Sequence, residues 1–114
     1  MPKTPEGEVR KWFLKELKKE FGPKIYIQIN HQSRYTSRGI PDITLCILGV
    51  VLWVELKSAT GKLSDLQRIR MTEIRAAGGH ATTLIGKDTQ KFSRIVQFIR
   101  SKAKLTGGSN GRKD

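Results

Sequence analysis

Two acids and a lysine stand at the ends of two apolar segments in the middle of the chain. Asp42 comes directly before the apolar residues 43–48. Glu55 and Lys57 end a second apolar run, which begins after Gly49. Both runs are short and rich in β-branched residues, so the glycine between them predicts a β-hairpin. Because side chains alternate along a strand, Glu55 and Lys57 are expected on the same face.

The position of the hairpin loop decides which residue lies opposite Asp42. A Leu48-Gly49 loop places Asp42 opposite Glu55, whereas a Gly49-Val50 loop places it opposite Lys57. In either register the three polar side chains share a face, because a two-residue loop pairs residues whose side chains point to the same side of the sheet. A three-residue loop without a bulge would separate them. The other face is apolar, with Ile43, Leu45, Ile47, Leu52, Val54 and Leu56.

Two carboxylates that face each other across a strand pair repel each other unless something compensates their charge. Oxygen ligands suit Mg²⁺ or Mn²⁺, and such an ion polarises a phosphate and lowers the pKa of a bound water. Lys57 can stabilise charge that develops at phosphorus or orient the attacking water. The pattern therefore predicts a metal-dependent nuclease site. The alternative is a plain hairpin whose polar ends are solvated.

The composition limits the size of the protein and its partners. A chain of 114 residues is long enough for one domain with one core. A net charge of +12 favours a polyanionic partner, and nucleic acid rather than a membrane surface. The single cysteine, Cys46, and the lack of a signal peptide or long apolar run predict an intracellular, cytoplasmic protein. No phosphate-cradling P-loop is present, so we expect no nucleotide cofactor.

A helix is predicted from Thr4-Pro5 to about Glu20, where Gly22-Pro23 ends it. Its apolar stripe consists of Val9, Trp12, Phe13, Leu14 and Leu17. Glu6 falls near the centre of this stripe, which selects it as the helix acid that faces the site. The alternative is that Glu6 only complements the helix dipole. Alternating isoleucines then predict a strand over residues 24–30.

The polar segment before the hairpin has the chemistry of a loop that contacts DNA. Arg34 and Arg38 suit phosphates, and Tyr35 suits stacking on a base. An ordinary solvated loop is the alternative. His31 can assist proton transfer, although no group that would orient it is visible.

A second helix is predicted from Asp65 to about Ala77, and Ser64 with Gln67 forms a capping box at its start. Its core face is expected to consist of Leu66, Ile69 and Ile74, and Gly78-Gly79 ends it. A strand over residues 80–85 follows. Because a β-α-β crossover is right-handed, this strand should run parallel to the second hairpin strand.

A last helix, capped by Asp88 or Thr89, runs to about Lys104 with Phe92, Ile95, Val96 and Ile99 facing inward. Residues 106–114 are rich in Gly, Ser and charge, which predicts a disordered basic tail after a single domain over residues 1–105. The predicted fold is α/β in the order α-β-β-β-α-β-α, with a mixed four-stranded sheet flanked by helices. This is the order that a restriction-endonuclease-like fold requires.

The segment Gly39-Ile40-Pro41-Asp42, followed after twelve residues by Glu55-Leu56-Lys57, resembles the PD-(D/E)XK nuclease signature. Within that superfamily the chain is most similar to the VRR-NUC family of stand-alone phage and bacterial nucleases. The similarity covers about residues 4 to 86 and also rests on Thr4-Pro5-Glu6-Gly7, Arg38, Gln67 and Ala77-Gly78-Gly79.

The resemblance implies a restriction-endonuclease-like core and assigns roles to several residues. Glu6, Asp42 and Glu55 would hold Mg²⁺, with Mn²⁺ able to substitute. The backbone carbonyl of Leu56 would supply a further ligand. It also places Lys57 and Gln67 in the catalytic group, although the capping box explains Gln67 equally well. The expected DNA contacts are Arg34, Tyr35, Arg38, Lys62 and Arg68.

The implied activity is that of a divalent-metal-dependent DNA endonuclease that acts on Holliday junctions, flaps or forks. A domain this small must pair to cut two strands, so a homodimer is expected. One alternative is a sequence-preferring nickase or restriction-type nuclease. An alternative of another class is a nucleic-acid-binding module without catalysis.

Overall fold

The computed structural model describes residues 5–31 and 38–106, and it contains the seven predicted elements in the predicted order. They are α1 (Pro5–Phe21), β1 (Ile25–Ile29), β2 (Ile43–Ile47), β3 (Val50–Lys57), α2 (Asp65–Ala76), β4 (Ala81–Ile85) and α3 (Thr89–Thr106). The helix caps also agree with the prediction. Gly22 ends α1 with a φ of 73°, and the Asp88 side chain accepts from the backbone N–H of Lys91 at the start of α3.

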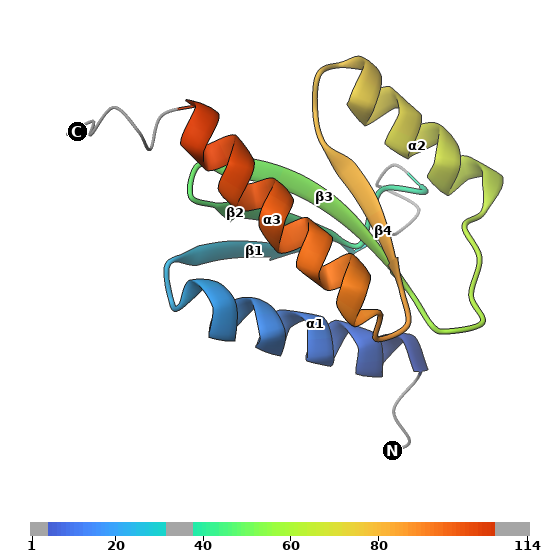
Figure 1. Ribbon diagram of the computed structural model, residues 1–114. Helices are drawn as coiled ribbons and strands as arrows, with labels where there is room; N and C mark the ends of the chain where they lie inside the picture. The colour runs from blue at the N-terminus through green and yellow to red at the C-terminus, as the bar shows by residue number, and fades with distance from the viewer. Residues whose placement is uncertain (1–4, 32–37, 107–114) are drawn as a thin grey trace.

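The four strands form one mixed sheet in the order β1-β2-β3-β4. The first three strands are antiparallel neighbours, and β4 runs parallel to β3, as predicted for the crossover through α2. In Figure 1, α1 and α3 lie together against the sheet, while α2 lies apart from them beside β4. The expected mixed sheet flanked by helices is therefore confirmed.

The hairpin has the first of the two possible registers. Ile47 pairs with Val50, which makes Leu48-Gly49 the loop. Both loop residues have positive φ, 53° for Leu48 and 80° for Gly49, and this is the geometry that a tight two-residue hairpin requires. Continuing the register one residue beyond the Ile43–Val54 pair brings Asp42 level with Glu55.

The core lies between the sheet and the helices α1 and α3. All six apolar residues predicted for one face of the hairpin are buried. From α1 the buried side chains are Val9, Phe13 and Leu17, and from α3 they include Ile95, Val96 and Ile99. Within residues 5–31 and 38–106, no helix combines the length and the apolarity needed to cross a bilayer.

The predicted core face of α2 is wrong at one position. Ile69 is 50% exposed, whereas Met71 is 2% exposed and is the buried residue of this helix. Leu66 and Ile74 are half-buried. The reason is that α2 contacts the sheet mainly through β4, where Met71 accepts a hydrogen bond from the Thr83 hydroxyl at 3.5 Å. Only a narrow stripe of the helix is therefore covered.

Candidate active site

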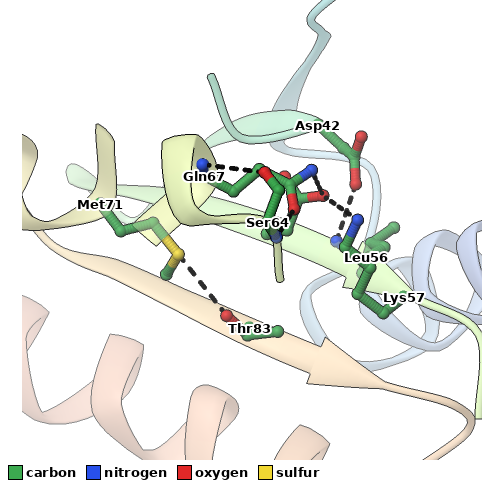
Figure 2. A network of polar contacts seen from close by, with 8 residues as sticks. Asp42, Leu56, Lys57, Ser64, Gln67, Met71 and Thr83 are labelled. Atoms are coloured by element: carbon green, nitrogen blue, oxygen red, sulfur yellow. Dashed lines mark hydrogen bonds and ion pairs between the residues drawn. The ribbon is translucent and has the colours of Figure 1, made fainter. Parts of the chain in front are cut away.

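Asp42 is held against β3 by a backbone hydrogen bond. Its Oδ2 accepts from the N–H of Leu56 at 2.8 Å, and Figure 2 shows the Asp42 side chain directed towards that backbone. The segment that carries Asp42 is anchored on its other side by Asn30. The amide of Asn30 donates to the carbonyl of Pro41 at 3.0 Å and to the hydroxyl of Thr44 at 2.9 Å. The carboxylate is thus positioned from both neighbouring strands.

Glu55 is a buried carboxylate whose two oxygens have different surroundings. The residue is 1% exposed. Its Oε2 accepts from Gln67 Nε2 at 2.9 Å and lies 3.4 Å from Lys57 Nζ. Its Oε1 is buried and has no hydrogen-bond partner among the described residues. An unsatisfied buried acceptor costs about 1–3 kcal/mol or more, so this oxygen is suited to receive a cation.

Burial raises the pKa of Glu55 from 4.5 to about 7. The nearby charge of Asp42, and a hydrogen bond from the protonated Glu55 carboxyl to Asp42, contribute in the same direction. The ammonium of Lys57 lowers the pKa but does not offset these effects. Near neutral pH the site therefore retains a proton that a divalent cation can replace, because ligands must be deprotonated to bind metal.

Lys57 ends β3 and is fixed at both its side chain and its backbone. Its side chain is 14% exposed and pairs with Glu55. Its carbonyl accepts from the N–H of Gly86 at 2.8 Å, just after β4. The ammonium group is therefore held beside the carboxylates and not free in solvent.

The capping box predicted for Gln67 is present, and the same side chain also contacts Glu55. Its backbone N–H donates to Ser64 Oγ at 3.1 Å, and its Oε1 accepts from the N–H of Ser64 at 2.8 Å, which completes the capping box. Its Nε2 donates to Glu55 at 2.9 Å. The start of α2 thus orients the Glu55 carboxylate. Figure 2 shows the Ser64 and Gln67 side chains that form this end of the helix.

Glu6 lies at the edge of the site. It lines a hollow of about 100 Å³ together with Gly7, Arg10, Asp42 and Leu56. Glu6 lies on the side of α1 that carries the apolar stripe, but its side chain is exposed and not buried, because the first turn of the helix opens onto this hollow. Among the described residues no three acids, histidines or cysteines gather into a metal cluster. The structure therefore brings together Asp42 and Glu55, with Glu6 at the rim.

Three of the residues expected to contact DNA lie at the surface. Arg38, Lys62 and Arg68 are exposed, and Arg68 pairs with Asp65 at 3.3 Å. His31 is also exposed. Arg34 and Tyr35 lie outside the described residues.

Two contributors to the site were missed from the sequence. Asn30 anchors the segment before Asp42, and its only sequence signal is a polar residue at a strand end. Arg10 lines the hollow one helical turn after Glu6, a spacing that could have identified it.

An acid pair with an unpartnered oxygen fits a divalent cation. The donors are carboxylate oxygens, which hard cations such as Mg²⁺ prefer, and backbone carbonyls and waters commonly complete such sites. The chemistry of these described residues is thus compatible with the predicted metal, which Asp42 and Glu55 would hold.

Comparison with solved structures identifies the fold. One structure described as a VRR_NUC domain superposes with a TM-score of 0.65 at 24% identity, over 83% of this chain and 97% of the other. A VRR_NUC domain protein gives a TM-score of 0.67 at 19% identity, over 88% and 92% of the two chains. The fold is that of VRR_NUC domains. The expected restriction-endonuclease-like architecture is thereby confirmed. No family model and no curated protein sequence matches the chain.

Proposed function

We propose that this protein is a divalent-metal-dependent DNA endonuclease of the VRR-NUC family. The observation that carries the proposal is the buried Oε1 of Glu55, which has no partner among the described residues and lies beside a second carboxylate and an ammonium group. Most buried side-chain oxygens accept a hydrogen bond, so an ionised carboxylate oxygen without a donor is a candidate metal ligand. Similarity to VRR_NUC structures supports the same reading of the site.

Each side chain has a distinct role in the proposed reaction. Asp42 and Glu55 hold Mg²⁺ or Mn²⁺, and the carbonyl of Leu56 and the rim acid Glu6 are candidates for further ligands. The bound ion supplies polarisation of the scissile phosphate and acidity for the attacking water. Lys57 stabilises negative charge at phosphorus or orients the water. Gln67 holds Oε2 of Glu55, which would leave Oε1 to bind the ion.

The proposed substrate is structured DNA, such as a four-way junction, a flap or a fork. The net charge of +12 supports binding to the DNA backbone. The proposal includes a homodimer that cuts two strands. Arg38, Lys62 and Arg68 remain candidate backbone contacts, with Arg34 and Tyr35.

Lys57→Ala tests the assignment of the site. We expect Mg²⁺-dependent cleavage to fall by about 100-fold or more, because a charge-stabilising group at the reacting phosphate is removed. DNA affinity in EDTA should stay within about twofold, since one of many cations is lost. Lys18→Ala, which removes an exposed lysine of α1, is the matched control and should retain activity.

The substrates in this assay separate the alternatives. Wild-type protein is incubated with a supercoiled plasmid, a linear duplex and a four-way junction in Mg²⁺ or Mn²⁺. Preference for the junction supports a structure-specific nuclease, whereas preferred cutting of the plasmid or duplex at defined positions supports a sequence-preferring nickase or restriction-type enzyme. Binding without any cleavage would identify a nucleic-acid-binding module and refute the proposed function.

A further inference from the structure

The positive charge of the protein is concentrated on α3. This helix carries five cations and no acid, whereas α1, of similar length, has five cations and four acids. On α3, Arg100 is paired with Glu20 at 3.1 Å. Lys91 and Arg94 have no ion pair with any described residue. Like charges on one helix repel each other, so this surface is suited to a polyanion.

Lys91 and Arg94 line a hollow of about 330 Å³ at the start of β4. Arg75 of α2 lines it from the other side, and none of its described lining residues is acidic. Three cations from two helices therefore surround one depression. Its floor is largely apolar and includes Leu52, His80, Ile95 and Phe98.

The cation from α2 is fixed in position. Arg75 donates from Nε and Nη2 to the carbonyl of Ala81, at 3.3 and 2.8 Å. A guanidinium has five N–H donors, so further donors remain for a ligand. The aromatic part of the floor is also ordered, because the rings of His80 and Phe98 meet edge to face with centroids 4.9 Å apart. The hollow thus combines a positioned donor with an aromatic surface.

We propose that this hollow binds an unpaired nucleotide of the DNA substrate. The phosphate lies among Arg75, Lys91 and Arg94, and the base or sugar packs on the floor at Phe98. A volume of about 330 Å³ exceeds the needs of a lone phosphate and matches the small end of ligand pockets. Aromatic side chains beside cations are the usual platform for single-stranded nucleic acid. A base in a duplex is stacked and paired, so only an unpaired one can enter.

The hollow is placed to act with the candidate active site. Ala81 lines it, and Thr83, two residues further along β4, pairs with Glu55 of β3. Two residues of strand span roughly 7 Å. The Glu55 carboxylate lies on the side of the sheet that α2 covers, at Gln67, whereas Leu52 and Ile95 place the hollow on the side of α3. Because β4 is an edge strand, one DNA strand can contact both places by passing around this edge. The choice of DNA as ligand rests on the proposed function, and the inference narrows the substrate to DNA with a single-stranded part.

The test compares two double variants that remove the same charge. Lys91→Gln with Arg94→Gln removes two cations of the hollow, and Lys15→Gln with Lys18→Gln removes two exposed cations of α1. Affinity of the full chain for oligo-dT and for a blunt duplex with equal phosphate number is measured by fluorescence anisotropy in EDTA. We expect the hollow variant to lose about tenfold in oligo-dT affinity, with the salt slope reduced by roughly one. The control variant should lose about twofold or less, and duplex affinity should change little in both.

A second variant tests the floor. Phe98→Leu keeps an apolar side chain but removes the ring, so oligo-dT affinity should fall severalfold while the salt slope stays unchanged. Circular dichroism establishes that each variant is folded. Equal losses in the two double variants, or equal losses for oligo-dT and duplex, would overturn the inference.

Because binding is measured in EDTA, the result is independent of catalysis. If the hollow variant binds oligo-dT as wild type does while Lys57→Ala abolishes cleavage, the nucleotide site is refuted and the proposed function stands. If wild type never cleaves DNA but the hollow variant loses oligo-dT binding, the nucleotide site stands and the nuclease is refuted.

Discussion

The two oxygens of the Glu55 carboxylate differ in a way that determines how the residue can act. Oε2 accepts a hydrogen bond from Gln67 Nε2 and lies beside the Lys57 ammonium group. Oε1 accepts no hydrogen bond from any described residue. Because both donors contact Oε2, a cation would be stabilised most by binding to Oε1. The arrangement therefore favours a single-oxygen contact between Glu55 and a metal ion.

The raised pKa of Glu55 predicts how the metal-free protein responds to pH. The pKa is about 7 in the folded protein and 4.5 in an exposed glutamate, so the folded state binds the extra proton in this window. The contribution of Glu55 to the free energy of unfolding is therefore complete below about pH 4.5. It decreases as the pH rises towards 7, by up to roughly 3 kcal/mol. Glu55→Gln cannot ionise and should remove this dependence.

Urea unfolding in EDTA between pH 4 and pH 8 measures the effect. Glu55→Gln should be more stable than wild type at pH 8 and close to wild type at pH 4. Glu73→Gln, which neutralises an exposed acid on α2, is the control and should follow wild type. If wild type and Glu55→Gln lose stability in parallel, the buried carboxyl does not titrate in this range.

At the scale of elements, the start of α2 is connected to the active site through one amide. The capping box fixes Oε1 of Gln67 on the backbone of Ser64, which turns Nε2 towards Glu55. A group behind a metal ligand commonly changes metal affinity by 10- to 100-fold when it is lost. The cap of this helix therefore has a role beyond helix stability.

Two substitutions of Ser64 separate these roles. Ser64→Ala removes the hydroxyl cap but keeps the N–H that holds Gln67, so it should destabilise the protein by about 1 kcal/mol and leave Mn²⁺ affinity within about threefold. Ser64→Pro removes the N–H as well, and the φ of −75° at this position is compatible with proline. We expect Mn²⁺ affinity to fall about tenfold in this variant, measured by titration calorimetry.

The control is the corresponding cap of α3. Asp88 accepts from the N–H of Lys91 at 2.9 Å, three residues later, as Ser64 does from Gln67. Asp88→Ala should destabilise the protein without changing Mn²⁺ affinity. A similar fall in affinity for Asp88→Ala and Ser64→Pro would show that the site responds to general destabilisation.

The elements also show how far the sequence could determine the structure. Two-residue periodicity was sufficient to place Glu55 and Lys57 on one face and to identify the six buried residues of the hairpin. It could not choose between the two loops, because both registers bury the same apolar face. Leu48 adopts a φ of 53°, which is unfavourable for a leucine, so local preference argued against the loop that forms.

Helical periodicity failed where a helix extends beyond its contact with the sheet. Glu6 lies on the apolar side of α1 by angle, yet its side chain is exposed at a hollow. Ile69 is exposed because α2 covers little of the sheet. A helical pattern shows which side chains share a face, but the extent of the neighbouring surface is a tertiary property. The connection between Gln67 and Glu55 likewise depends on two segments separated in the chain.

At the scale of the whole molecule, two carboxylates face the position of the proposed substrate within a protein of net charge +12. The cations attract the DNA backbone, whereas Asp42 and, above about pH 7, the ionised Glu55 repel a phosphate at the site itself. A divalent cation would remove this repulsion. Without one, the acids should weaken DNA binding although they are required for cleavage.

The double variant Asp42→Asn with Glu55→Gln should therefore bind DNA more tightly than wild type in EDTA, by about three- to tenfold at low salt. Cleavage in Mg²⁺ should be abolished. Glu16→Gln with Glu20→Gln neutralises two acids of α1 and has the same net charge, so it measures the effect of charge alone. Because Asp42 and Glu55 lie at the proposed site, the gain in DNA affinity of their double variant should exceed the gain of the control at every salt concentration tested by anisotropy. An equal gain in both variants would show that the phosphate does not approach these acids, and the proposed site of reaction would have to be abandoned.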